Sequence, residues 1–334
     1  MLRMGVTLHT GDMSMAEIVE YARLAEELGY DGFWPTEESG KDAFQVLAVL
    51  AGMTRRIRLG TGIVNVYSRS PTLLAMSATT LDRLSGGRAF LGLGTGGIGF
   101  MERGHGIAIE RPLARMREYL AIIRRLLAGE RMSYEGRFFR LRDFHLRERP
   151  PRADLPLYVA ALNPRMIEVA GEAGDGVILN FLTPEHLAEE VRPRLQAGAA
   201  RAGRDPGAAS VYTLAVTCVE PGAPGALAAV KKTVAFYCAS PHYHHIVSTG
   251  GFPAEAVAIK AVWDAGGHER ATRMVPDEMV ARFTLSGTSA KVRRQLEAYA
   301  RAGVYPIIYP IPRQGSVAAD MMRAIRLVAE IARG

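Results

Sequence analysis

The chain has 334 residues, of which 48% are hydrophobic and 22% are charged. This composition is typical of a globular protein with a large core, and no apolar run approaches the roughly 20 residues that cross a bilayer. The start, MLRMGVTLHT, lacks the apolar segment of a secretion signal, so we expect a cytoplasmic protein that does not bind membranes.

The formal net charge of +7 comes mainly from arginine. The arginines are spread through the predicted helices and do not alternate with aromatic residues, so we expect no nucleic-acid partner. A basic rim would suit a small polyanionic ligand, and a solvated arginine-rich surface is the alternative. Cys218 and Cys238 form no CxxC pair and have no metal-ligand spacing, which favours two thiols in the core.

Apolar patterning in the first part of the chain predicts strands that alternate with helices. The expected strands are residues 3–9, 32–35, 57–63 and 89–93. The expected helices are residues 14–28, with Gly29 as the C-cap, 42–53 and 73–84. Such alternation indicates a parallel sheet, whose strands end at one common edge where ligands bind.

The second part of the chain continues the pattern, with a hairpin-like excursion at 129–151 and a helical insertion at about 221–284 beside the ligand face. The expected strands are 155–160, 176–179, 211–219 and 304–311, and the expected helices are 112–127, 164–173, 185–202, 289–302 and 317–332. Together these segments make eight strand–helix units in a single domain, residues 1–334.

The sequence GLGTGG, residues 92–97, matches the dinucleotide-binding pattern GxGxxG. It ends an internal strand rather than the first one, so we do not interpret it as a nicotinamide site. We expect its bare backbone to let a flat ring system or its tail approach closely. A tight turn that needs glycine is the alternative.

Two stretches, TGIVNVYSRSP and LDRLSGGRAFLGLGTGG, resemble the third and fourth strands of the luciferase-like flavin and deazaflavin oxidoreductases. The later segments LPLYVAALNPRMIEVAGEAGDGVILN, KKTVAFYCASP and FTLSGTSAKVRRQLEAYARAGV resemble the methylenetetrahydromethanopterin reductases, which use coenzyme F420. The resemblance implies a TIM (β/α)8 barrel, here with the helical insertion after strand seven. It also implies hydride transfer between F420 and a small organic substrate, and a dimer or higher homo-oligomer.

The family places a cis peptide bond where this chain has Gly62-Ile63, and this bond backs the flavin ring. It places the cofactor phosphate near the helix that starts after Ala161, where Asn163 would be the N-cap. The ordinary alternatives are a trans strand end and a simple helix cap. The cofactor-binding residues expected on this basis are Gly62, Ile63, Asn65, Thr95, Gly96, Gly97, Ala161, Asn163, Arg165 and Asn180.

Glu37 and Glu38 follow the second strand and are candidate catalytic acids. In a closed apolar pocket, either carboxyl group would have a raised pKa and could handle protons. A solvated loop acid or a charge at a helix N-terminus is the alternative. His9, at the end of strand one, is the third catalytic candidate, or else a satisfied polar residue.

The chain also departs from the reductases that it resembles. Their loop after strand two more often reads Thr-Asp-His, whereas this chain has Thr36-Glu37-Glu38. They carry acidic residues where this chain has Thr7 and Gly97. The substrate therefore stays open between a pterin-like compound and a simpler imine or carbonyl compound.

His242, His244 and His245 lack accompanying metal ligands, so we expect no metal and interpret SPHYHH as a segment that partly covers the substrate. Two alternatives to the F420 enzyme remain. One is a two-component monooxygenase that uses reduced FMN and oxygen, and the other is a flavin-binding protein without turnover.

Overall fold

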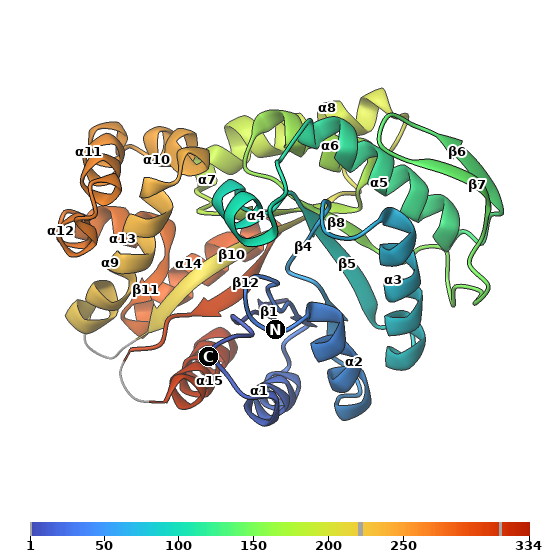
Figure 1. The fold of residues 1–334 in the computed structure, drawn as a ribbon. Helices are drawn as coiled ribbons and strands as arrows, with labels where there is room; N and C mark the ends of the chain where they lie inside the picture. The colour runs from blue at the N-terminus through green and yellow to red at the C-terminus, as the bar shows by residue number, and fades with distance from the viewer. Residues whose placement is uncertain (1, 220–222, 314–315) are drawn as a thin grey trace.

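The computed structural model describes residues 2–219, 223–313 and 316–334. Within them, eight parallel strands close into a barrel, because β10 pairs with both β9 and β12. Helices surround this barrel (Figure 1), which confirms the predicted TIM barrel. The barrel strands in spatial order are β1 (Gly5–Val6), β2 (Gly32–Phe33), β3 (Arg58–Gly60), β5 (Ala89–Gly94), β8 (Leu157–Ala160), β9 (Gly176–Asn180), β10 (Ser210–Val219) and β12 (Val304–Pro310).

The barrel interior is filled by side chains from alternate strand positions, as the two-residue period of a strand requires. Aromatic rings stack through its centre, with ring centroids 4.0 Å apart for Trp34 and Phe90 and 4.8 Å apart for Tyr158 and Tyr212. On β12, Tyr305 and Ile307 belong to this interior cluster, whereas Ile308 packs outward against the helices. The barrel is therefore a packed core, and ligand space is confined to its ends.

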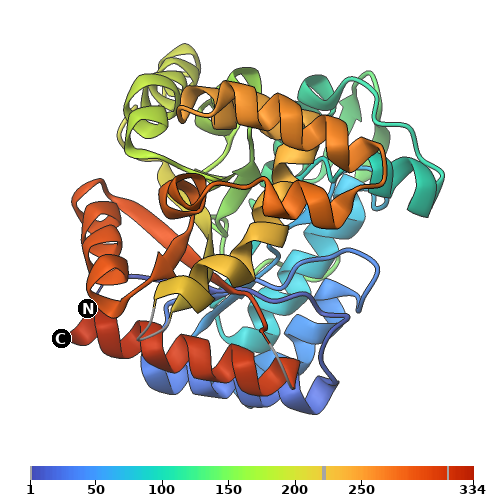
Figure 2. The same cartoon turned by 90° about the vertical axis from the view of Figure 1, so that its left-hand side faces the viewer.

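The helices outside the barrel begin and end largely where their caps predict. Ser14 and Glu17 form a capping box at the start of α1, and Gly29 ends that helix with a φ of 85°. Figure 2 shows α15 lying alongside α1, the first and last helices of the fold. The outer helices are α1 (Met15–Leu28), α2 (Ala43–Met53), α3 (Pro71–Ser85), α5 (Pro112–Leu127), α6 (Pro164–Ala173), α8 (Arg192–Arg201), α14 (Ser289–Arg301) and α15 (Val317–Arg333).

Three segments differ from the sequence prediction. The third strand is split, with β4 (Val64–Asn65) following β3 after a break, and the irregular stretch after β5 contains helix α4 (Ile98–His105). The predicted helix 185–202 is divided into α7 (Pro184–His186), a π-helical turn (Leu187–Val191) and α8. Pro193 explains this division, because it donates no backbone hydrogen bond and its ring crowds the preceding turn. The predicted hairpin is present as β6 (Met132–Glu135) and β7 (Arg140–Phe144).

The described part of the insertion between β10 and α14 contains five α-helices and the short strand β11 (Leu285–Gly287), which pairs with the end of β10. Residues 221 and 222 of the predicted insertion lie outside the described residues. Cys218 and Cys238 are both free thiols buried in the insertion's own core, as predicted. Figure 1 shows the insertion beside the barrel on the side away from α2 and α3. Its helices are α9 (Ala223–Ala239), α10 (His244–Thr249), α11 (Pro253–Asp264), α12 (His268–Arg273) and α13 (Asp277–Phe283).

Candidate active site

The carboxyl ends of the barrel strands bring most of the predicted site residues to one mouth, as expected for this architecture. Strand alternation decides which of them face inward. Tyr309 continues the inward face of Tyr305 and Ile307, and Asn180 continues the inward face of Ile178. Val6 and Leu8 pack outward against the helices, so His9, the residue after Leu8, faces inward.

The peptide bond between Gly62 and Ile63 is cis, as the family resemblance implied. A Cβ on Gly62 would lie 2.8 Å from the Trp34 carbonyl oxygen, so glycine is required there by the close approach of strand two. The same carbonyl accepts a 2.5 Å hydrogen bond from the buried Thr7 hydroxyl. Thr7 thus contributes to the wall of the mouth and offers no acidic group to a substrate.

The glycine-rich end of β5 serves two purposes. A Cβ on Gly94 would lie 2.7 Å from Ile63 Cδ1, and a Cβ on Gly92 would lie 2.1 Å from the Thr61 carbonyl oxygen. These two glycines therefore make room for the neighbouring strand. A Cβ on Gly97 would meet nothing within 4 Å, so the backbone there borders open space, and Gly96 adopts a φ of 72°.

Asn65 organises the loop that follows β4. Its Oδ1 accepts hydrogen bonds from the backbone N–H groups of Tyr67 (3.0 Å) and Ser68 (2.8 Å), which forms an Asx turn. Its Nδ2 donates to no described residue, although Asn65 is 4% exposed. Asn65 Cβ would be 3.6 Å from a Cβ on Gly96, so a free amide donor lies beside the glycine loop.

His9 lies between side chains from two distant parts of the chain, the loop after β2 and the strand β12. Its Nδ1 lies 3.4 Å from Glu38 Oε2 and 3.3 Å from Thr36 Oγ1, and its Nε2 forms a hydrogen bond with the Tyr309 hydroxyl. The side chain of His9 is 34% exposed and that of Glu38 is 58% exposed. Glu38 therefore reaches solvent, whereas Tyr309 lies deeper.

Each member of this group has a shifted pKa. The hydrogen bond to Glu38 raises the pKa of His9, and the same bond lowers the pKa of Glu38. The expectation of a raised Glu38 pKa is wrong, because the cationic partner outweighs burial. Burial raises the pKa of Tyr309, which keeps this phenol protonated over the physiological range.

Glu37 has a different environment from Glu38. Both of its carboxylate oxygens form hydrogen bonds with the Arg69 guanidinium, and Oε2 also accepts the Ala43 backbone N–H at 3.0 Å. Arg69 pairs with Asp42 as well. These contacts tie the start of α2 to the loop before α3 and give Glu37 a structural role, and its catalytic role stays a prediction.

The start of α6 carries the predicted phosphate-binding residues. Asn163 lies at the N-cap position and Pro164 begins the helix, but the Asn163 side chain makes no capping hydrogen bond. Ala161 is buried, whereas Asn163 and Arg165 are exposed. An open helix N-terminus beside an arginine suits an anion.

Asn180 connects the barrel to the insertion. Its Nδ2 donates a 3.1 Å hydrogen bond to the Tyr243 hydroxyl, and Tyr243 packs against Tyr237 with ring centroids 4.8 Å apart. Phe181, next along the chain, adopts a φ of 56° and stacks on Phe283. Sequence reasoning missed Tyr237, Tyr243 and Tyr309. Tyr309 had a signal, since it lies at the carboxyl end of a predicted strand, and Tyr243 lies in the SPHYHH segment that was expected to cover the substrate.

Of the histidines in SPHYHH, His242 lies in a 3₁₀ turn (Pro241–Tyr243), and His244 and His245 lie in α10. His245 Nε2 is 3.7 Å from Glu190 Oε1, and its ring lies 6.2 Å from that of His186. No group of three or more histidine, cysteine or acidic residues in the described ranges is placed to hold a metal ion. Over the same ranges, every helix is too short or too polar to traverse a bilayer.

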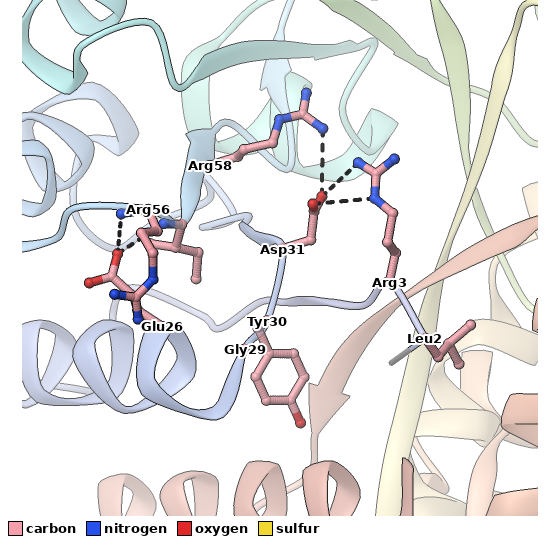
Figure 3. A pocket seen from close by; sticks show the side chains of 9 residues that line it. Leu2, Arg3, Glu26, Gly29, Tyr30, Asp31, Arg56 and Arg58 are labelled. Atoms are coloured by element: carbon pink, nitrogen blue, oxygen red, sulfur yellow. Dashed lines mark hydrogen bonds and ion pairs between the residues drawn. The ribbon is translucent and has the colours of Figure 1, made fainter. Parts of the chain in front are cut away.

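A surface hollow lies at the opposite end of the barrel, before the strands begin (Figure 3). Asp31 in this hollow accepts hydrogen bonds from Arg3 and lies 3.6 Å from Arg58. Glu26 accepts the backbone N–H groups of residues 55–57. The charged groups of this hollow are thus paired or hydrogen-bonded within the protein. In TIM barrels this end ordinarily contributes to stability and the opposite end to catalysis, so we do not assign the active site there.

Comparisons with known proteins identify the family of this chain. The model of the luciferase-like monooxygenase family matches residues 1–305. The chain is 33% identical to the 5,10-methylenetetrahydromethanopterin reductase of Archaeoglobus fulgidus, over 96% of this chain and 95% of the relative, and 33% identical to that of Methanolobus tindarius, over 94% of each. The structure of the coenzyme F420-dependent tetrahydromethanopterin reductase from Methanopyrus kandleri superimposes with a TM-score of 0.87 at 27% identity, covering 98% of this chain and 97% of that one. The barrel, its mouth and the full-length match together show that the chain belongs to the luciferase-like monooxygenase family.

Proposed function

We propose that this protein is an F420-dependent oxidoreductase that transfers a hydride between the deazaflavin C5 and an electrophilic carbon of a small organic substrate. The observation that carries the proposal is the full-length similarity to F420-dependent reductases, both in sequence and in structure. The cofactor supplies the hydride chemistry, and the protein supplies binding, orientation and protons.

The mouth has groups that fit the parts of this cofactor. Ile63, half-buried above the aromatic interior, offers an apolar floor for a flat ring. The free Asn65 amide and the open backbone at Gly97 lie beside it, with Thr95 and Gly96 in the same loop. Asn163 and Arg165 would hold a phosphate at the start of α6.

His9 and Glu38 are the groups that we assign to proton handling. Their mutual pKa shifts favour an imidazolium–carboxylate pair, and both side chains are partly open to solvent. A substrate whose reduction also needs a proton, such as an imine or carbonyl compound, suits this pair of ionisable side chains. Pterin-like compounds belong to the same chemical class.

The test is anaerobic turnover with reduced F420 that carries deuterium at C5 and a panel of imines and carbonyl compounds. We expect deuterium on the product carbon and turnover that does not require oxygen. Turnover that requires oxygen and reduced FMN would instead support the monooxygenase alternative. Binding of F420 without turnover of any compound would support a flavin-binding protein.

A homo-oligomer, a dimer or higher, is also part of the proposal. Helices α2 and α3 pack against each other and expose Val49, Met53, Leu73, Met76 and Leu84, each at least 40% exposed. An apolar surface shared by two adjacent helices is typical of a subunit interface. The free thiols of Cys218 and Cys238 suit a cytoplasmic location, where cysteines stay reduced.

A further inference from the structure

The hydrogen bond between His9 and Tyr309 links the two ends of the chain at the barrel mouth. Tyr309 is on the same inward face of β12 as Tyr305 and Ile307, and its position is the outermost of the three. It also packs against the apolar core of the insertion. One side of its ring is therefore dry, and its hydroxyl is held beside the imidazole.

We propose that Tyr309 is the proton donor to the substrate, and that His9 and Glu38 form the relay that reprotonates it from solvent. The three groups run in order from the exposed Glu38 carboxylate, through the His9 ring, to the half-buried Tyr309 phenol. This inference rests on the proposed function and adds to it the residue that delivers the proton.

The step balances in atoms and charge. When the substrate carbon accepts a hydride, the electron pair of its C=O or C=N bond moves to oxygen or nitrogen. That atom forms a bond to the Tyr309 proton as the phenolic O–H bond breaks. As this O–H bond breaks, the phenolic oxygen takes the Nε2 proton of the His9 imidazolium. The neutral imidazole keeps its Nδ1 proton on the side that faces Glu38, and solvent then returns a proton to Nε2 of the partly exposed ring.

The charges around these groups favour this direction of transfer. His9 faces Glu38, Thr36 and Tyr309, and Asp12 on its own loop adds negative potential. Tyr309 faces His9, with the Tyr237 phenol from α9 and the Glu38 and Asp12 carboxylates nearby. A free phenolate would be disfavoured there, so Tyr309 should lose its proton to the substrate at the same time as it gains one from the cationic imidazole.

The test compares Tyr309→Phe with Tyr305→Phe, which removes a tyrosine hydroxyl four positions earlier on the same strand and face. General acid catalysis usually contributes about 10²- to 10⁴-fold. We expect Tyr309→Phe to lower kcat about 100-fold while the Kd for F420 changes less than about twofold. Equal kcat in Tyr309→Phe and Tyr305→Phe would overturn the proposal.

A second readout needs no cofactor. The proton shared by His9 and Tyr309 should give a downfield NMR signal in the protein alone, lost in Tyr309→Phe and in His9→Gln but retained in Tyr305→Phe. A signal that persists in Tyr309→Phe would overturn the relay even if F420 binds. Conversely, failure of the wild-type protein to bind F420 would overturn the proposed function and leave the NMR result intact, so the two failures are distinguishable.

Discussion

Replacing Gly94 by alanine should displace the floor of the cofactor site. A Cβ at this position would lie 2.7 Å from Ile63 Cδ1, 2.8 Å from Ile63 Cγ1 and 3.3 Å from Ala160 Cβ. Carbon atoms in contact are separated by about 3.5–4.0 Å, so Ile63 must move by about 1 Å. Because Gly94 and the rest of β5 lie on one side of Ile63, the Ile63 side chain has to move to the other side, toward the proposed cofactor site.

Overpacking of this size usually costs about 1–3 kcal/mol of stability. If the displaced Ile63 costs about 1.4 kcal/mol in the complex as well, F420 binds about tenfold more weakly. Chemical denaturation measures the first effect, and a fluorescence titration with F420 measures the second.

Two further variants sharpen the test. Gly97→Ala should leave stability unchanged, because a Cβ there meets nothing within 4 Å, and should weaken F420 binding only if the cofactor lies against this loop. Ile63→Ala combined with Gly94→Ala removes the clash, so the double variant should be more stable than the sum of the single effects predicts. Wild-type affinity for F420 in Gly94→Ala would refute the reasoning.

The remaining predictions concern charged groups. Glu37→Gln should cost about 2 kcal/mol of stability through the lost charged hydrogen bonds to Arg69 and leave the affinity for F420 unchanged; a large loss of kcat at full stability would show that Glu37 is a catalytic acid. Glu38→Gln should lower the pKa of His9, as NMR titration can show. The difference in stability between this variant and the wild type should be largest between pH 4.5 and 6.5, the ordinary pKa values of glutamate and histidine. It should vanish as the pH falls through the lowered Glu38 pKa or rises through the raised His9 pKa. A stability difference that is independent of pH would contradict the pairing. Arg165→Gln should weaken F420 binding more at low than at high salt, since a phosphate contact is screened by ions, and equal losses at both would exclude that contact.

Local patterns were sufficient to predict most of the fold. The apolar period of residues 14–28 and the C-cap Gly29 predicted the bounds of α1 almost to the residue. Short-range periodicity predicted eight strand–helix units and a parallel sheet, and the family resemblance implied that this sheet closes into a barrel. The break near Pro193 was missed in the predicted helix 185–202, although proline cannot continue a helix without a local adjustment.

The site depended on contacts that no local pattern contains. Glu37 and Glu38 are sequence neighbours, yet one is bound to Arg69 and the other to His9. His9 and Tyr309 are separated by 300 positions, so their contact follows only from closure of the barrel. Glycines in GLGTGG looked alike in sequence, whereas the structure separates Gly94, which makes room for Ile63, from Gly97, which borders open space.

The most direct test of the account is an equilibrium titration of the purified protein with F420 and with FMN, oxidised and reduced, at low and moderate salt. The account predicts tight, salt-sensitive binding of F420 and much weaker binding of FMN. Preferential binding of reduced FMN would contradict the hydride-transfer function and point to chemistry with oxygen.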